Sequence, residues 1–271
     1  MAVINVEIKN AIEAIRMLFV KNTGLLGESA LSSHERELRA TRPMKFLLAV
    51  SGGPDSQALL KAFPHVCKEI GELKYCAPIG CIACGINHGL RAEADAELDL
   101  AENLAHDMDI EFVRHKIHIE GTNNIMCKAR DLRYEKLYEV ADEFGCDYVV
   151  TAHHFDDKAE TVLIRLLRGE GVGSLAVLPI LSGRIFRPLL NITRADIMGY
   201  IKRWNLPYAT DPSNSNFHYL RSRIRHEILP LLEEINPAIK KRLVSLSNEI
   251  DFFEDAKRWI NEELTSKVMN Q

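Results

Sequence analysis

Strand-like and helix-like segments alternate along most of this chain, and this alternation limits the folds open to it. Short apolar runs that suit strands are separated by longer segments in which apolar residues recur at helical spacing. The expected strands are residues 45–50, 80–87, 111–118, 147–152 and 184–187, and the expected helices are 55–68, 92–107, 124–144 and 157–168. Such alternation predicts an α/β fold, a Rossmann-like parallel sheet with helices on both faces. Ligands of these sheets bind at the carboxyl ends of the strands, so the residues that follow each strand are the first candidates for function.

The same patterns divide the chain into three expected parts. Residues 1–43 form an N-terminal helical extension, with an amphipathic helix over 4–20, and residues 44–188 form the α/β domain. Beyond Leu190 the periodicity is wholly helical apart from the turn-forming residues 211–216, so residues 189–271 are expected to form a small helical subdomain.

Composition indicates an ordinary globular protein. At 271 residues and 46% hydrophobic content, the chain can bury one sizeable core. Its apolar stretches fall short of the ~20 residues of a membrane helix, and residues 1–20 carry charges without a signal-peptide core. Six cysteines scattered through apolar segments favour reduced core thiols over a disulfide framework. We therefore expect a cytoplasmic protein with no membrane association.

The net charge of −4 conceals a local basic segment. Residues 184–226 carry eight Lys and Arg residues against two aspartates, a local charge of +6, which leaves −10 for the rest of the chain. A basic segment on an acidic body fits contact with a phosphate backbone. A solvated basic face is the alternative.

The first strand runs directly into a glycine turn. The loop consists of Ser51, Gly52, Gly53, Pro54, Asp55 and Ser56. Paired glycines let the backbone turn sharply and present N–H groups to an anion, and the following helix directs its positive end to the same place. Pro54 suits the first helical turn, while Asp55 offers a carboxylate to the Mg²⁺ that accompanies ATP. We interpret the loop as a pyrophosphate cradle; an ordinary strand-to-helix turn is the alternative.

These loop residues resemble those of the ATP pyrophosphatase (PP-loop) superfamily, whose pattern is Ser-Gly-Gly-x-Asp-Ser. The Gly-Lys-Ser/Thr of a Walker loop does not follow. The resemblance implies that ATP is cleaved between its α- and β-phosphates, so that a substrate oxygen takes AMP and pyrophosphate leaves.

Further polar residues follow other predicted strands. His88 ends the second strand, and His153 ends the fourth, followed by Asp157 and Glu160 on a helix whose expected buried stripe is Ala159, Val162, Leu163, Leu166 and Leu167. Carboxylates at a helix N-terminus can hold Mg²⁺ or a cationic substrate, and a histidine can donate to a transferring phosphoryl group. A structural role for His88 and helix capping by Asp156 are the alternatives.

Two other groups carry possible chemistry. Cys81 and Cys84 form a Cys-x-x-Cys, but residues three apart on a strand point to opposite faces, which favours core packing over a metal or redox site. Pairs of arginines share helix faces at Arg130 with Arg133 and at Arg221 with Arg225, where they suit phosphate or RNA contacts. Solvated helix decoration is the alternative for the second pair.

Taken in order, these residues resemble the bacterial tRNA(Ile)-lysidine synthetases. The resemblance runs from about residue 45 to about residue 235 and includes the PP-loop, His88 to Arg91, Ala129-Arg130, Arg133-Tyr134, residues 151–157, Glu160-Thr161, Arg168-Gly169, Arg187 to Leu189, Asp211 to Asn214 and Arg221 to Arg225. It implies adenylation of C2 of the wobble cytidine of the CAU-anticodon isoleucine tRNA by ATP. The ε-amine of L-lysine then attacks, and AMP leaves.

The resemblance also implies roles for single residues. Asp55 would hold Mg²⁺, His153 and Asp157 would act at the α-phosphate and the amine, and Asp157 or Glu160 would receive the lysine ammonium. The loop with His88 would bind ATP, and the tRNA would be met by the basic segment, with Arg130, Arg133, Arg168, Arg187, Arg221 and Arg225 as candidates.

Two departures from the family pattern and two other functions accompany this interpretation. Ser222 stands where the family usually has asparagine, and the residues after Ile235 are too few for the C-terminal domain of many members. The other functions are a tRNA-thiolating PP-loop enzyme that uses Cys81 and Cys84, and a nucleotide-binding protein without turnover. A homodimer is one assembly that the sequence allows.

Overall fold

The central strand forms where the sequence is apolar on both faces. The structure is a computed structural model that describes residues 3–22, 43–72, 79–89, 93–119, 125–210 and 220–269. In β1 (Met44–Val50), Phe46 and Leu48 pack into one hydrophobic cluster and Leu47 into another on the opposite face. A strand that is buried on both faces belongs in the middle of a sheet.

The sheet is mostly parallel, as the alternation predicts. Its six strands within the described residues run in the order β3-β2-β1-β4-β6-β5. The other strands are β2 (Ile79–Asn87), β3 (Phe112–Lys116), β4 (Tyr148–Val150), β5 (Leu181–Ser182) and β6 (Ile185–Phe186). Only β5 is antiparallel to its neighbour among these strands, and this short edge strand was not predicted. Because β1 is followed on one side by β2 and on the other by β4, the strand order reverses at β1, which is where such sheets bind ligands.

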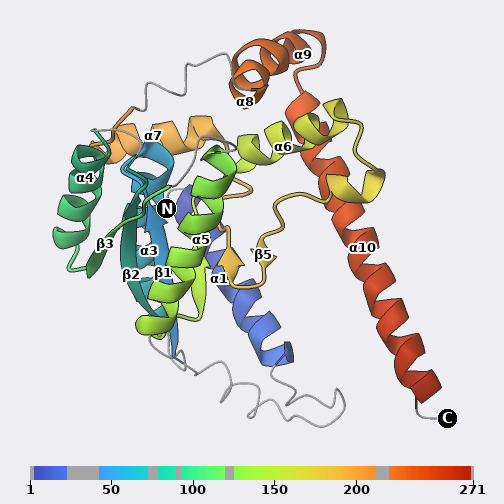
Figure 1. Cartoon of the computed structure of the whole chain (residues 1–271), viewed down its shortest axis with the longest axis horizontal. Helices are drawn as coiled ribbons and strands as arrows, with labels where there is room; N and C mark the ends of the chain where they lie inside the picture. Colours follow the sequence, from blue (N-terminus) through green and yellow to red (C-terminus); the bar gives the residue numbers. More distant parts are fainter. Residues whose placement is uncertain are drawn as a thin grey trace. The chain divides into compact units, whose positions relative to one another are not determined.

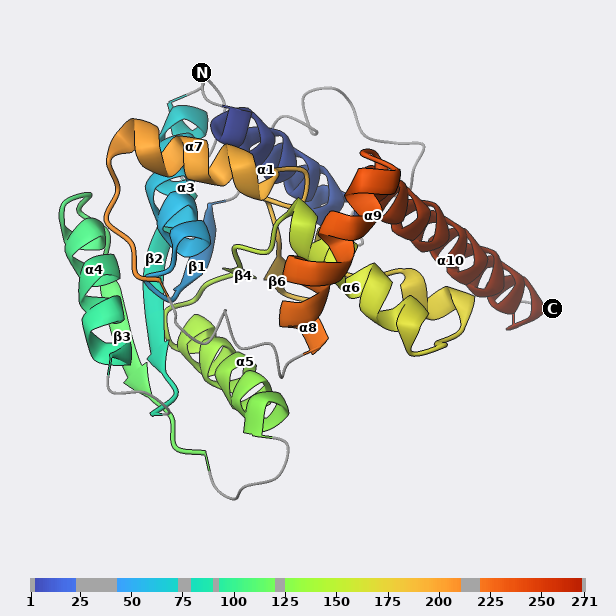
Figure 2. The same cartoon turned by 90° about the horizontal axis from the view of Figure 1, so that it is seen from above.

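Helices cover both faces of the sheet, which confirms the predicted fold class. The helices are α1 (Val3–Asn22), α3 (Pro54–Gly71), α4 (Ala94–His106), α5 (Ile125–Glu143) and α7 (Arg194–Trp204). Figures 1 and 2 show α1, α3 and α7 side by side on one face and α5 on the other. The two hydrophobic clusters agree, because residues of α1, α3, α4 and α7 share one cluster and residues of α5 contribute to the other.

The N-terminal helix is part of the core. Its residues Ile4, Ile8 and Ile12 are fully buried among side chains of α3 and the sheet, at the helical spacing that predicted an amphipathic helix. None of the described helices is long and apolar enough to cross a membrane.

The chain divides into two compact units, and their limits differ from those of the three predicted parts. Unit 1 comprises residues 1–154 and 180–210, and unit 2 comprises residues 155–179 and 211–271. Unit 2 contains α6 (Phe155–Leu167), a 3₁₀ helix (Val172–Leu175), α8 (Leu220–Arg223), a π-helical turn (Ile224–Ile228), α9 (Leu229–Ile235) and α10 (Ile239–Met269). The boundary expected near residue 188 lies inside unit 1, because α7 packs on α3 instead of joining the later helices.

Candidate active site

Unit 1 brings four predicted positions to one edge of its sheet. Ser51 follows β1, His88 follows β2, His153 lies shortly after β4, and Arg187 follows β6. Because β2, β1, β4 and β6 are neighbouring parallel strands, their carboxyl ends meet at the same edge. The sequence predicted this edge as the ligand site, and the topology places these residues there.

The loop after β1 depends on a glycine at its second position. Gly52 has φ of +77°, a left-handed conformation that favours glycine, and a Cβ atom there would overlap the backbone carbonyl oxygen of Glu97 in α4. Its own carbonyl oxygen accepts a hydrogen bond of 2.9 Å from the backbone N–H of Ala209, beyond α7. Segments far apart in the sequence therefore hold the loop in its sharp turn.

Ser56 closes the loop through its hydroxyl. Ser56 Oγ accepts a hydrogen bond of 3.1 Å from the backbone N–H of Ser51 and donates one of 2.9 Å to the carbonyl oxygen of Gly53. The two serine hydroxyl groups also lie 3.3 Å apart. Pro54 opens α3, so the first turn of this helix faces the loop. This is the geometry of an anion cradle at a helix N-terminus.

Asp55 lies against a histidine that the sequence analysis did not select. His154 Nε2 is 3.7 Å from Asp55 Oδ2, and the His154 side chain is only 1% exposed, whereas that of Asp55 is 30% exposed. The Asp55 side chain is thus partly exposed, with its Oδ2 within ion-pair distance of the buried histidine. The signal was available, because His154 follows His153 directly at the end of β4 and adjacent residues on an extended segment point in opposite directions.

The two predicted histidines are each oriented locally. His153 Nδ1 lies 2.9 Å from the hydroxyl of Thr151, within hydrogen-bond distance. Beside His88, the left-handed Gly89 donates its N–H to the side chain of Asn87 at 2.7 Å, and this asparagine donates in turn to Asp95 at 2.5 Å. Leu90 and Arg91, which belong to the same motif, lie outside the described residues.

Three of the predicted tRNA-binding arginines gather around one tyrosine in unit 1. The guanidinium groups of Arg130 and Arg133 lie 5.7 and 5.3 Å from the centre of the Tyr134 ring, a distance that allows cation–π attraction. Arg187 is only 6% exposed, and its guanidinium interacts electrostatically with the same tyrosine. Burial lowers the pKa of Arg187, and the positive charge of Arg130 acts in the same direction. A buried arginine among others makes this a candidate site for an anion.

Unit 2 pairs the predicted lysine-binding carboxylates with predicted tRNA-binding arginines. Glu160 accepts from Arg221 Nε at 2.9 Å and from Arg225 Nε at 2.6 Å. Asp157 Oδ1 accepts from Arg221 Nη2 at 3.0 Å and lies 3.3 Å from Arg225 Nη2. We call these four residues the charge cluster. Arg225 lies in the π-helical turn, a rare widened turn that often occurs at functional positions.

The expected buried stripe of α6 is partly wrong. Ala159, Val162 and Leu163 are buried as predicted, but Leu166 and Leu167 are 41% and 56% exposed, and Glu160, expected off the stripe, is buried. Glu160 can be buried because two guanidinium groups compensate its charge. Asp156 pairs with Lys240 of α10 at 3.0 Å. Helical periodicity alone does not reveal ion-pair partners that lie much later in the sequence.

The remaining predicted residues belong neither to the loop after β1 nor to the charge cluster. Arg168 is 62% exposed and pairs with Glu170 at 3.8 Å on the surface of unit 2. The motif Asp211 to Asn214 lies outside the described residues. Cys81 and Cys84 pack into different hydrophobic clusters on opposite faces of β2, which confirms that this Cys-x-x-Cys cannot close on one ion.

The described residues contain no group of three or more His, Cys, Asp or Glu side chains placed to hold a metal ion. Mg²⁺, however, is commonly bound through one or two carboxylates together with substrate phosphates. Asp55, a partly exposed carboxylate in the loop, fits that kind of site.

Comparison with known proteins agrees with this geometry. The model of a family described as the PP-loop domain matches residues 28–232. The chain is 34% identical over 247 residues to the tRNA(Ile)-lysidine synthase of Treponema denticola, covering 86% of this chain and 51% of that protein. It is 35% identical over 224 residues to that of Porphyromonas gingivalis strain W83, covering 80% and 47%. The chain thus spans about half the length of these relatives.

Among solved structures, the chain is similar to the U34-tRNA thiolase NcsA from Methanococcus maripaludis, solved with its [4Fe-4S] cluster. The TM-score is 0.63 at 22% identity, covering 80% of this chain and 77% of that one. At this identity the likeness shows a common fold.

Proposed function

The chain belongs to the PP-loop family, and from this premise we propose that it ligates L-lysine to C2 of the wobble cytidine of the CAU-anticodon tRNA(Ile). The reaction would consume ATP, pass through an adenylated cytidine, and yield lysidine, AMP and pyrophosphate. The observation that carries the proposal is the loop from Ser51 to Ser56, closed by its own hydrogen bonds beside Asp55 at the sheet's ligand edge. The similarity to relatives named tRNA(Ile)-lysidine synthase supports a tRNA as the acceptor of AMP and lysine as the nucleophile.

The loop would hold the pyrophosphate half of ATP. Backbone N–H groups at the turn of Gly52 and the N-terminus of α3 favour negative charge there. Asp55 would hold Mg²⁺, which supplies charge neutralisation of the phosphates when bound. The contact of His154 with Asp55 would fix the orientation of that carboxylate.

Other residues of unit 1 would contact the nucleotide and the tRNA. His153, whose ring is oriented by the contact of its Nδ1 with Thr151, would donate to the α-phosphate. Arg187 and the neighbouring arginines at Tyr134 would meet the phosphates of the anticodon loop. His88, at the end of β2, would contribute to the nucleotide site from the next strand.

The charge cluster of unit 2 would receive the lysine substrate. Asp157 and Glu160 carry the negative charge that an ammonium requires, but both already pair with guanidinium groups. An incoming ammonium must therefore compete with Arg221 and Arg225 for the same oxygens. Displaced arginines would be released to tRNA phosphates, so lysine and tRNA binding would assist each other through these two side chains. Arg168, already exposed, would add a further phosphate contact.

One assay tests the proposal directly. The purified chain is incubated with a tRNA(Ile) transcript bearing CAU, ATP, Mg²⁺ and labelled lysine, and the RNA is examined for label. We expect label in the RNA, dependent on ATP, together with release of AMP and pyrophosphate. Asp55→Asn should abolish the incorporation of label into the RNA. Glu69→Gln, a change elsewhere on α3, should leave it unchanged.

Three outcomes would overturn the assignment. A transcript with another wobble base that accepts lysine equally well would remove the specificity proposed here. Incorporation of sulfur and not lysine would favour the thiolating enzyme, and ATP consumption at background with both substrates present would favour a binding protein without turnover. Sedimentation of the same preparation would decide whether the chain forms the homodimer that its sequence allows.

A further inference from the structure

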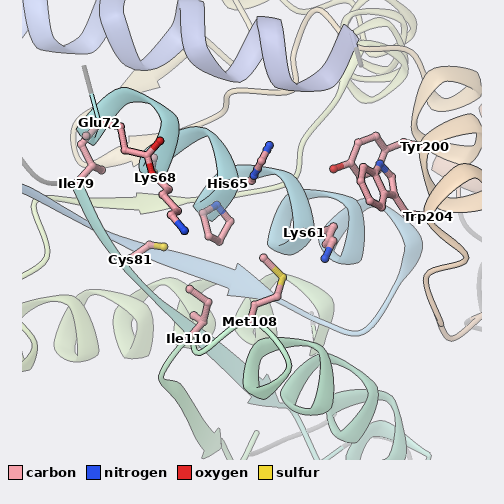
Figure 3. A pocket seen from close by; sticks show the side chains of 13 residues that line it. Lys61, His65, Lys68, Glu72, Ile79, Cys81, Met108, Ile110, Tyr200 and Trp204 are labelled. Atoms are coloured by element: carbon pink, nitrogen blue, oxygen red, sulfur yellow. The ribbon is translucent and has the colours of Figure 1, made fainter. Parts of the chain in front are cut away.

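Unit 1 contains a cavity that the proposed ligase chemistry does not use. It has a volume of about 610 Å³ and lies along the second half of α3, against the first residues of β2 and the end of α7. Its lining includes Lys61, His65, Lys68, Cys81, Tyr200 and Trp204, which Figure 3 shows around the opening. The volume lies within the range of about 300–1,000 Å³ typical of small-molecule sites. Because Ile79 and Cys81 begin β2, this cavity is at the opposite end of the strand from His88.

Two cysteines meet at the wall of this cavity. Cys67 of α3 and Cys81 of β2 both line it and pack into the same hydrophobic cluster. Cys67 is only 2% exposed, whereas Cys81 is partly exposed. Cys81 is therefore the more accessible of the two thiols, and Cys67 the more buried.

The two cysteines of the Cys-x-x-Cys motif differ in reactivity. The hydrogen bond from Cys67 lowers the pKa of the Cys81 thiol, although burial acts in the other direction. Burial raises the pKa of Cys84, on the opposite face of the same strand, to about 12. Since the thiolate is the nucleophile, Cys81 is the reactive member and Cys84 an inert thiol on the same strand.

Positive charge gathers at the cavity on one side of α3. Lys61, His65 and Lys68 recur at helical spacing and all line it. Lys61 also lies 5.7 Å from the centre of the Trp204 ring, and His65 pairs with Glu69 at 3.1 Å. Glu72 lines the cavity as well, so the two lysines leave a net positive wall that favours an anionic ligand.

We propose that Cys81 and Cys67 form a redox-active pair that exchanges with an anionic low-molecular-weight disulfide bound in this cavity. Cys81 attacks one sulfur of the bound disulfide, forming a mixed disulfide and expelling one thiolate. Cys67 then attacks the Cys81 sulfur, which forms the Cys67–Cys81 bond and expels the second thiolate. Both cysteines line the same cavity, and the bond forms when their sulfurs approach to about 2.05 Å.

The exchange is balanced without any further reactant. Two protein thiols are oxidised to one disulfide, and one small disulfide is reduced to two thiols. The two protons of Cys81 and Cys67 pass to the two released thiolates. The product bond ties α3 to β2, so the helix that begins at the phosphate loop becomes covalently fixed to the sheet.

This site is tested without the ligase reaction, so its failure and that of the proposed function are distinguishable. The reduced full-length chain is incubated with oxidised glutathione, quenched with a thiol-blocking reagent, digested and analysed by mass spectrometry. We expect a Cys67–Cys81 disulfide as the first and main product. Cystamine, a disulfide that carries positive charge, should react about tenfold more slowly if the lysines guide the ligand.

Single variants separate the two steps. Cys67→Ser should accumulate the glutathione adduct on Cys81, because the resolving thiol is gone, and Cys81→Ser should leave Cys67 unmodified. Cys84→Ser is the matched control and should behave as the unaltered protein. The double change of Lys61→Gln and Lys68→Gln should remove the preference for glutathione over cystamine. Circular dichroism of each variant establishes that it is folded before the exchange is measured.

Several results would overturn the proposal. Equal oxidation of Cys84 and Cys81, an adduct on Cys67 in the Cys81→Ser variant, or no adduct on Cys81 in the Cys67→Ser variant each contradicts the assigned roles. Reaction only at the exposed Cys127 would show a surface thiol and no built site. An unchanged preference after both lysine changes would remove the anionic ligand from the proposal.

Discussion

The phosphate loop of unit 1 and the charge cluster of unit 2 both consist of predicted site residues, but they are held by different forces. The loop is fixed by its backbone: a left-handed glycine, a serine hydroxyl joined to two backbone groups, and the start of a helix. The charge cluster is fixed by side chains, with two carboxylates and two guanidinium groups compensating one another.

This difference bears on how each region can respond to a ligand. A backbone cradle is formed before the ligand arrives and needs no rearrangement to accept a pyrophosphate. The charge cluster already has partners, so a ligand there must exchange one ion pair for another. We therefore expect the loop to tolerate little change and the charge cluster to be adjustable, and four stability measurements test this contrast.

The largest effect should come from Gly52→Ala. A Cβ atom at Gly52 would overlap the carbonyl of Glu97 while the backbone is held at φ of +77°, so the loop or α4 must shift. We expect a loss of about 3 kcal/mol in the free energy of unfolding. Urea unfolding followed by circular dichroism measures it.

The neighbouring Gly53→Ala provides the control. Gly53 has φ of −74°, and an added Cβ would meet only the Ser51 hydroxyl at 3.7 Å, an ordinary contact. Its stability should stay close to that of the unaltered protein. Equal losses at both glycines would mean that the conformation of Gly52 does not hold the loop.

The next effect should come from Glu160→Gln in the charge cluster. Glu160 is 2% exposed in its side chain, and its change to glutamine would remove its ion pairs with Arg221 and Arg225. We expect the free energy of unfolding to fall by about 2 kcal/mol. This is less than for a fully buried ion pair, because both arginines reach solvent. The Glu170→Gln change, at an exposed acid whose arginine partners are 3.7 and 3.8 Å away, should cost almost nothing.

A double-mutant cycle with Arg225→Gln would measure the coupling inside the charge cluster. The loss of unfolding free energy in the double variant should be clearly smaller than the sum of the losses in the two single variants, because either change alone breaks the same hydrogen bonds. Additive losses would contradict the view that the charge cluster acts as one unit.

Ser56→Ala should have a smaller effect, about 1 kcal/mol. The change removes the acceptor of the Ser51 N–H and the donor to Gly53. Ser51→Ala, which loses only the contact between the two hydroxyl groups, should lose less. If the order were reversed, the loop would depend on the Ser51 hydroxyl and not on the backbone bonds of Ser56.

The same contrast explains what the sequence could predict. All nine strands and helices that the sequence predicted between residues 45 and 187 are present in the structure. The loop was predictable because its residues are adjacent in the chain. Contiguous motifs carry their geometry with them, since turn, cap and helix start are set by local backbone preferences.

Contacts across the chain were not predictable in this way. The burial of Glu160 depends on arginines more than sixty positions later, and the contact of Asp55 with His154 joins the start of α3 to the segment between β4 and α6. Sequence spacing placed Asp55 and His153 at one edge, but which of two adjacent histidines faces the carboxylate is decided by the packing of β4. The two-residue strand β5 gave no periodicity to detect.

The smallest predicted effect concerns an acidic side chain of unit 2 whose negative charge is less well compensated than that of Glu160. Asp251 of α10 has a raised pKa because burial and then the like charge of Asp255 disfavour its ionised form, against weaker opposing effects of Lys158 and Arg258. A carboxyl group whose pKa is higher in the folded state costs stability at neutral pH, and the cost disappears as the pH falls through that raised value toward 3.8. Asp251→Asn should therefore stabilise the protein by less than about 0.5 kcal/mol at neutral pH and have no effect below 3.8. Urea unfolding at both pH values measures the difference, and a destabilised variant at neutral pH would show that Lys158 and Arg258 compensate this acid as the arginines compensate Glu160.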